Sequence, residues 1–456
     1  GPSGEVTWRA RRDSQQRLAA IELEGSGLPQ VAASFEYDGA TPKRFTRSNG
    51  MVTDVVYDQY GLLKSVFATL NGQFVDGYEV LERDSRLFVT KVAQPNFQGI
   101  GSRFEFDELG RTKSAKLGLL DLQQFEVPFP QARAATEVEL EYFGSSQLRR
   151  ERRTTDSSGT TVDTYGIDPT TGLYASFNGL PFTYDAADRV TRNPDGKGYG
   201  YNTLGEMTEI KDPSGSTLVA MEYDLFGRLF AVEDAATAER STHRWLGSTR
   251  LITENRQGEK TVHVPYPGVA DEDIAFYKES VGAVTGYYPT VDSNYSVSKV
   301  FTDGSSAVTE EYVYSFDGKA TKRSAGGSGS VNNNEFLGMQ SIGHDTSHVR
   351  ARQYDQAMGI FLQRDPRQGA AGNVDAAQSF VSNNPINLRD PAGLQASADE
   401  LSKLLGEYGH QISPQEILGM ERKVESAQPL ARDISVVIVA TGENIASIPD
   451  RFRTAI

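Results

Sequence analysis

A short pattern that recurs about every 20 residues constrains the fold of this chain more than any other feature. It consists of an apolar or aromatic pair, Tyr-Asp or a relative of it, two or three further residues, a glycine, and often an arginine with a short apolar strand. The pattern occurs as FEYDGA (35–40), VYDQYGLLKSV (56–66), FEFDELGRTKSAKL (104–117), FTYDAADRVTR (182–192), YGYNTLGEMTEI (199–210), MEYDLFGRLFAVED (221–234) and YVYSFDGKATK (312–322). A fixed period of this kind is typical of repeat architectures, in which each unit stacks on its neighbours to bury its apolar face.

Each repeat unit has the features of a strand, a tight turn and a second strand. Tyr and Phe favour strands, while Asp-x-x-Gly favours a turn because Asp bonds the backbone two residues on and Gly accepts positive φ. The chain has 20 Tyr, 22 Phe and 44 Gly among 456 residues, and no long stretch before residue 397 has the apolar period of a helix. We therefore predict an all-β fold, a long winding antiparallel sheet in which the Tyr rings pack between hairpins and the Asp side chains bond turn amides.

The composition also excludes several classes of function. A net charge of −15 argues against nucleic-acid binding by the bulk surface, because phosphates are bound by basic patches. The chain has no cysteine, which excludes disulfides, zinc sites of the Cys type and thiol catalysis, and we expect no cofactor. No apolar stretch approaches the length of a membrane span. The first residues, Gly1-Pro2-Ser3-Gly4, look like a scar of tag removal, so we expect a piece of a larger protein.

Residues 350–394 carry a second pattern, RARQYDQAMGIFLQRDPRQGAAGNVDAAQSFVSNNPINLRDPAGL, and nothing after it resembles anything before it. The repeats resemble the YD repeats of the Rhs and teneurin superfamily. The second pattern resembles the Rhs repeat-associated core of polymorphic toxins and Tc toxin C components, roughly R-x-Y-D-x-x-x-G-x-F-x-x-x-D-P, a spacer, and N-N-P-x-N-x-x-D-P-x-G-L. The matching positions are Arg352, Tyr354, Asp355, Gly359, Phe361, Asp365, Pro366, Asn383, Asn384, Pro385, Asn387, Asp390, Pro391, Gly393 and Leu394.

The resemblance implies an architecture and a use. The repeats would form a strip of β-hairpins that spirals into a hollow shell, which the core closes around a C-terminal polypeptide. In secreted members that polypeptide is a toxin and the shell cuts itself just after the Gly-Leu, whereas in animal teneurins the shell serves adhesion. We expect a YD-repeat shell over residues 1–286, an Rhs core over residues 287–394 and a C-terminal effector or cargo segment over residues 395–456.

Self-cleavage requires groups that hydrolyse a peptide bond without a thiol or a metal. A serine nucleophile in the core would lack a nearby histidine as its base, because no histidine lies between His348 and His410. Carboxylates are available in Asp365 and Asp390, each followed by proline, and in Asp375 in the spacer between them. Two carboxylates that are forced close together share one proton, so that the pair acts as acid and base at once.

The resemblance also implies a role for particular residues. These are Asp365 and Asp390 as an aspartyl dyad, Leu394 and Gln395 as the scissile pair, and Arg364 as the residue that orients a carboxylate or stabilises the oxyanion. The spacer GAAGNVDAAQSF departs from the usual Gly-Leu-Asn-Leu-Tyr, so Asp375 is an alternative member of the dyad. Asp-Pro-x-Gly is also a turn sequence, which leaves open a structural cage with an inactive protease.

Histidines and aromatic residues leave a binding module open as a further alternative. His243 lies beside Trp245, and His344 and His348 are four residues apart. The second pair would share a face only in a helix, and Asp345 between the two makes a loop the expected structure. These residues could form a sugar or metal site, and together with the adhesion role that the teneurin resemblance implies they leave a cell-surface adhesion or carbohydrate-binding module as the alternative to a toxin shell.

Residues 395–456 differ in character from the repeats. Ser397 with Glu400, and Ser413 with Glu416, form capping boxes before apolar residues, and an apolar strand follows at residues 434–440. We expect a short α/β segment, the start of a truncated effector, held inside the shell. For the full-length protein we expect synthesis in the bacterial cytoplasm followed by secretion or cell-surface display, with delivery-machinery proteins or an immunity protein as partners.

Overall fold

The computed structural model describes residues 6–94, 101–266, 272–280, 282–324, 330–365, 377–390 and 393. Among these residues the regular structure consists of antiparallel strands and a few 3-10 turns. The all-β fold predicted from the repeats is confirmed. The expected α/β segment over residues 395–456 lies outside the described residues.

Consecutive strands pair in sequence order throughout, which makes each sheet a meander. The first sheet contains β1 (Thr7–Arg12), β2 (Leu18–Glu24), β3 (Val31–Asp38), β4 (Thr41–Arg47), β5 (Val52–Tyr57), β6 (Leu63–Leu70), β7 (Gln73–Arg83), β8 (Val89–Ala93), β9 (Gly101–Phe106), β10 (Thr112–Leu119), β11 (Ala134–Tyr142), β12 (Arg149–Asp156), β13 (Gly159–Asp168), β14 (Leu173–Phe177) and β15 (Leu180–Pro181). Two 3-10 turns, η1 (Leu122–Phe125) and η2 (Phe129–Gln131), lie between β10 and β11.

The second sheet continues directly from the first, since only Phe182 lies between β15 and β16. It contains β16 (Thr183–Tyr184), β17 (Val190–Arg192), β18 (Gly198–Tyr201), β19 (Met207–Lys211), β20 (Thr217–Tyr223), β21 (Leu229–Asp234), β22 (Glu239–Leu246), β23 (Thr249–Asn255), β24 (Lys260–Pro265), β25 (Asp273–Ser280), β26 (Ala283–Val291), β27 (Val297–Thr302), β28 (Val308–Tyr314) and β29 (Ala320–Ser324). A smaller sheet follows, with β30 (Gln340–Gly343), β31 (Thr346–Val349), β32 (Arg352–Asp355) and β33 (Ile360–Phe361), flanked by η3 (Phe336–Gly338) and η5 (Val381–Asn383).

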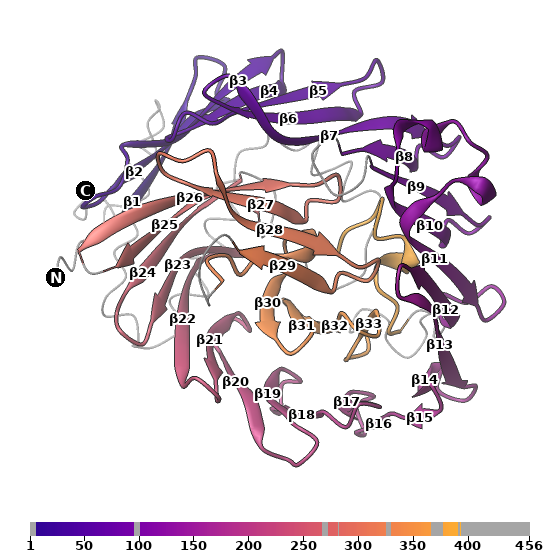
Figure 1. Ribbon diagram of the computed structural model, residues 1–456. Helices are drawn as coiled ribbons and strands as arrows, with labels where there is room; N and C mark the ends of the chain where they lie inside the picture. The colour runs from indigo at the N-terminus through magenta and orange to yellow at the C-terminus, as the bar shows by residue number, and fades with distance from the viewer. Residues whose placement is uncertain are drawn as a thin grey trace.

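The strip of strands winds into a spiral (Figure 1). The first sheet forms the upper and right-hand wall, β16–β23 continue the circuit below and to the left, and β24–β29 return inside the start of the strip. The small sheet β30–β33 lies within this wall, in orange. The expected boundary between residues 286 and 287 lies within β26, and the division into domains stays a proposal from the motifs.

Contacts between the two ends of the spiral hold its turns together. The Trp8 ring nitrogen donates to the carbonyl of His263 at 3.0 Å. The buried Arg47 guanidinium donates to the carbonyls of Ile274 and Pro289, at 2.8 and 3.0 Å. The apolar cluster beneath these contacts joins the two layers, with Ile21, Leu23, Phe35, Phe45, Val264, Ile274, Tyr277, Tyr288 and Phe301 among its buried members. The first strands of the chain are thus packed against strands that follow some 240 residues later, as the separation between Arg47 and Pro289 illustrates.

The Asp-x-x-Gly turns explain why the sequence folds into this strip. The Asp224 carboxylate accepts the N–H groups of Phe226 and Arg228, at 2.8 and 3.1 Å, and pairs with the Arg228 guanidinium at 2.6 Å. Gly227 donates to the Asp224 carbonyl and has a φ of 74°, which glycine adopts without strain. The same capping occurs at Asp13, Asp58, Asp84, Asp107 and Asp185. The predicted role of the aspartates is confirmed.

Tyrosines of the repeats bond the strand that precedes them. The hydroxyl of Tyr37 on β3 donates to the Leu18 carbonyl on β2 at 2.9 Å, and that of Tyr201 on β18 donates to the Val190 carbonyl on β17 at 2.9 Å. Both rings also pack against the apolar clusters of the wall. The predicted packing of Tyr between hairpins is confirmed.

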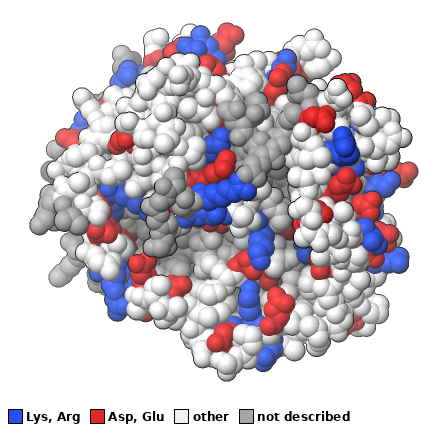
Figure 2. Space-filling model, viewed as in Figure 1, with Lys and Arg blue, Asp and Glu red and all other residues white. Residues whose placement is uncertain are grey.

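Charges of both signs are interspersed over the face of the molecule in Figure 2. Many of them pair between strands, as Arg44 on β4 does with Asp54 on the neighbouring β5 at 2.6 Å, and as Arg240 on β22 does with Glu222 on β20, across β21, at 2.8 Å. Such exposed pairs each contribute little stability, about 1 kcal/mol or less. In the described part of the chain, no helix has the length and apolar character needed to cross a bilayer.

Candidate carboxylate site

Both aspartates of the expected dyad contact one buried arginine. Arg352 extends from β32, Asp365 follows β33, and Asp390 follows η5. Nη2 of Arg352 lies 2.9 Å from Oδ2 of Asp390 and 3.4 Å from Oδ2 of Asp365. The three side chains retain only 1–2% of their exposed surface. The two carboxylates therefore share one counter-ion in an enclosed site.

The same arginine also holds the backbone of the segment that leads to the expected cut. Nε of Arg352 donates to the carbonyl oxygen of Gly393 at 2.6 Å. Gly393 has a φ of 66°, and a Cβ atom there would collide with the Val349 carbonyl on β31. Its N–H donates to the Asp390 carbonyl at 3.2 Å. Glycine is required here because the chain passes against β31 in the left-handed conformation.

Packing fixes the orientation of the Arg352 guanidinium. Its central carbon lies 3.5 Å from the centre of the Phe361 ring, on the neighbouring strand β33. Burial lowers the pKa of the Arg352 guanidinium, and Asp390 and Asp365 offset part of this shift. Arginine nevertheless remains protonated in proteins.

The turn after β33 brings Asp365 to this position. The Leu362 N–H donates to the Gln353 carbonyl at 2.9 Å, and the Asp365 N–H donates to the Ala377 carbonyl at 3.1 Å. This main-chain bond ties Asp365 to the segment that leads through η5 to Asp390.

The other residues expected at the site have different positions. Arg364 forms an ion pair with Asp188 at 2.6 Å, in the turn between β16 and β17. Asp375, Leu394 and Gln395 lie outside the described residues. The chemical position expected for Arg364 is held by Arg352, which the sequence analysis matched to the core motif without a role of its own.

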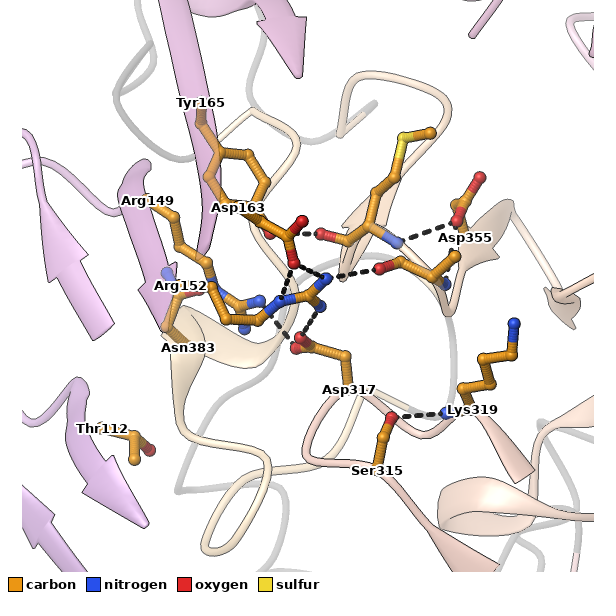
Figure 3. A network of polar contacts seen from close by, with 12 residues as sticks. Thr112, Arg149, Arg152, Asp163, Tyr165, Ser315, Asp317, Lys319, Asp355 and Asn383 are labelled. Carbon is orange, nitrogen blue, oxygen red and sulfur yellow. Dashed lines mark hydrogen bonds and ion pairs between the residues drawn. The ribbon is translucent and has the colours of Figure 1, made fainter. Parts of the chain in front are cut away.

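A second buried network joins the wall to the core (Figure 3). Arg149 on β12 pairs with Asp317, in the turn between β28 and β29, at 2.7 Å. Arg152 bridges Asp317 and Asp163, at 2.5 and 2.6 Å. Burial raises the pKa of Asp317, but the two arginines more than offset it and hold this pKa below its ordinary value. The network thus joins β12 and β13 of the first sheet to the β28–β29 turn through buried ion pairs, and no sequence motif predicted it.

A hydrogen-bonded chain runs from β30 of the small sheet across β22–β25. Nδ1 of His263 lies 2.7 Å from Oδ2 of Asp273, and Nε2 of His263 lies 3.0 Å from Oγ1 of Thr253. Nδ1 of His243 lies 3.1 Å from the same hydroxyl, and Gln340 on β30 meets Nε2 of His243 at 3.0 Å. Because Asp273 only accepts, each bond points towards it, from Gln340 through His243, Thr253 and His263. Burial lowers the pKa of both histidines.

The histidines singled out in the sequence occupy structural positions. The ring nitrogen of Trp245 donates to the Leu229 carbonyl at 2.8 Å. His344 lies in the hairpin turn between β30 and β31, and His348 is buried on β31, where its Nδ1 lies 3.0 Å from the Gln353 amide. Within the described ranges, no group of three or more His, Asp or Glu side chains is placed to hold a metal ion.

Comparisons with known proteins identify the fold. No protein-family model and no curated protein matches the sequence. The structure is similar to the crystal structure of TcdB2-TccC3, with a TM-score of 0.68 and 16% identity over 85% of this chain and 21% of that chain. It is similar to the same complex without its hypervariable C-terminal region, with a TM-score of 0.68 and 15% identity over 85% of this chain and 20% of that chain.

A structure of the Photorhabdus luminescens Tc holotoxin pore gives the same result, a TM-score of 0.68 and 15% identity over 86% of this chain and 20% of that chain. The chain thus spans about a fifth of the length of these neighbours. The chain therefore shares the fold of these Tc toxin structures, in agreement with the resemblance that its repeats and core motif carry.

Proposed function

We propose that this chain is the wall of a shell that encloses its own C-terminal polypeptide and severs it by aspartyl self-cleavage between Leu394 and Gln395. The observation that carries the proposal is the triple contact of Arg352 with Asp365, Asp390 and the Gly393 carbonyl. Gly393 is joined directly to Leu394, so the bond to be cut begins one residue from an atom that Arg352 holds.

The chemistry needs one proton shared between the two aspartates. The ionised carboxylate removes a proton from a water molecule, whose oxygen attacks the Leu394 carbonyl carbon, while the protonated carboxyl donates to the carbonyl oxygen. Collapse of the tetrahedral intermediate breaks the bond to the Gln395 nitrogen, which takes up the proton that the first carboxylate removed from water. The second carboxylate recovers its proton from the hydroxyl of the intermediate, so the pair returns to its starting state. Arg352 stabilises the ionised carboxylate and fixes the preceding peptide unit.

Enclosure explains why the shell cuts and then retains its cargo. Once the bond is broken, only noncovalent contacts and the wall hold the peptide, so its release depends on opening of the shell. Residues 434–440 are an apolar stretch of sequence, which contact with the inside of the wall would bury. Secretion and the delivery-machinery partners belong to the same proposal, since the neighbours of similar fold include a Tc holotoxin pore.

The test combines three conservative variants with size-exclusion chromatography. Asp365→Asn and Asp390→Asn should each abolish cleavage and leave the wall folded, because Asn keeps the shape but cannot ionise. Asp375→Asn should be cut normally. If this variant alone of the three lost cleavage, Asp375 would be a member of the dyad in place of Asp365 or Asp390. The severed peptide should co-elute with the shell, and a freely separating peptide would contradict enclosure.

A further inference from the structure

The stretch Asn383-Asn384-Pro385-Ile386-Asn387 docks on the wall of the first sheet through its amides. Oδ1 of Asn387 accepts the N–H of Val89, the first residue of β8, at 2.6 Å. Nδ2 of Asn384 donates to the carbonyl of Gly110, in the turn between β9 and β10, at 2.9 Å. The two side chains also bond each other, since Nδ2 of Asn387 donates to Oδ1 of Asn384 at 3.0 Å. Three hydrogen bonds thus fix the direction of the chain just before Asp390.

Asn383 extends the same docking to β12. Its Oδ1 accepts from Nε of Arg149 at 2.7 Å, and its Nδ2 donates to the Gln147 carbonyl at 2.5 Å. Figure 3 shows Asn383 and Asp317 on either side of the Arg149 guanidinium. The stretch therefore forms hydrogen bonds with the first sheet at three successive places, which are β8, the β9–β10 turn and the start of β12.

Apolar contacts continue the docking on both sides of the asparagines. Ile386 packs against the cluster of the first sheet that contains Val89 and Phe104, and Leu388 packs against the core cluster that contains Phe361. Ile386 and Leu388 thus place the stretch between the wall and the sheet that carries Arg352.

The backbone that enters this stretch is strained. Val381, Ser382 and Asn383 have φ values of 40°, 51° and 56°. The left-handed region is unfavourable for a β-branched residue such as valine, and consecutive left-handed residues persist only where their surroundings hold them. Without the hydrogen bonds that Asn383, Asn384 and Asn387 make to the wall, a segment of this kind would adopt a different backbone conformation.

We propose that Asn383, Asn384 and Asn387 are positioning residues that carry Asp390 and Gly393 to Arg352 only after the first sheet has folded. The inference rests on the proposed self-cleavage and adds a regulation to it. The hydrogen bonds span 234 to 298 residues of sequence, so they cannot form until the wall from β8 to β12 is in place. Completion of the wall is thereby a condition for cutting, and a chain with an unfinished wall keeps its cargo attached.

The test follows cleavage during refolding of the full chain by intact-mass spectrometry. Asn387→Leu removes the acceptor for Val89 while keeping the size of the side chain, and we expect cleavage to slow by about 100-fold. Asn387→Asp retains that acceptor and should recover most of the rate. Asn202→Ala is the matched control, because Asn202 caps a turn of the second sheet through the N–H groups of Leu204 and Glu206. It should be cut at the parent rate.

Hydrogen exchange in an uncut background separates docking from chemistry. In the Asp365→Asn chain, which keeps the contact between Arg352 and Asp390, residues 383–393 should be protected, and adding Asn387→Leu should abolish that protection while Asn202→Ala leaves it. Unchanged protection, or a parent rate of cleavage in Asn387→Leu, would overturn the positioning role. A parent chain that is never cut would instead refute the proposed self-cleavage.

Discussion

Arg149 and Asp317 form an ion pair at 2.7 Å in which each side chain retains only 1% of its exposed surface. The pair connects β12 of the first sheet to the turn between β28 and β29, which ends the second sheet. Because Asn383 bonds the same arginine, one buried guanidinium on β12 of the first sheet contacts both the end of the second sheet and the core. The ion pair thus stabilises the contact between the first sheet, the end of the second sheet and the core.

Removing the carboxylate of this pair should be costly. Asp317→Ala leaves a buried arginine uncompensated, and we expect a loss of about 3–5 kcal/mol in the free energy of unfolding, measured by urea denaturation. Glu222→Ala, which breaks the exposed pair with Arg240, should cost about 1 kcal/mol or less. Similar losses for the two variants would contradict the bracing role.

Gly393 should tolerate no side chain. Gly393→Ala places a methyl group against the Val349 carbonyl and should displace the segment from Arg352, so we expect cleavage to stop. Gly215→Ala is the matched control, because Gly215 also has a positive φ, of 94°, but faces open space. The control should lose about 1–2 kcal/mol of stability and still be cut. Both outcomes can be read by denaturing electrophoresis.

The two arginines near the site should differ sharply in importance. Arg352→Lys supplies one compact charge in place of a guanidinium that contacts two carboxylates and a carbonyl, and we expect cleavage to slow by about 100-fold or more. Arg364→Ala breaks the ion pair with Asp188 and should change the rate only slightly. A larger effect at Arg364 than at Arg352 would reverse the assignment of roles.

The free energy of unfolding should depend on pH in part through Glu272. Burial raises the pKa of Glu272 to about 7, although Arg389 and Arg47 lower it in part. The folded state therefore favours the protonated form, and this stabilisation is complete below the unfolded pKa and is lost as the pH rises through about 7.

Comparison with Glu272→Gln isolates this effect. Between about pH 5 and about pH 8 the parent should lose on the order of 2 kcal/mol relative to the variant in urea denaturation. The buried histidines act with the opposite sign, since burial lowers their pKa, but both proteins contain them and their effect cancels. A constant difference between the two proteins would show that Glu272 is not buried in its acid form.

Local sequence rules account for the repeats of the fold, because each turn is decided by neighbouring residues. Asp224 bonds the amides two and four residues on, and Gly227 supplies the positive φ, as the Asp-x-x-Gly pattern predicts. The pairing of hairpins in sequence order follows from the same pattern.

Contacts that depend on strand register or on the winding of the strip could not be predicted from the sequence. The chain from His243 to Asp273 depends on the register of four strands, which no motif specifies. For the candidate site, the motif indicated Asp365 and Asp390 but placed the arginine role on Arg364, next to Asp365 in sequence. The spiral instead brings Arg352 to both carboxylates, because the winding of β32 and β33 decides which side chains meet.

Intact-mass spectrometry of the purified chain decides whether the protein cuts itself through its aspartates. Self-cleavage yields two species whose masses add up to that of the chain plus one water, with the smaller one beginning at Gln395, whereas Asp390→Asn should give a single uncut species. A single full-length mass for the parent, or a cut that persists in Asp390→Asn, would contradict aspartyl self-cleavage.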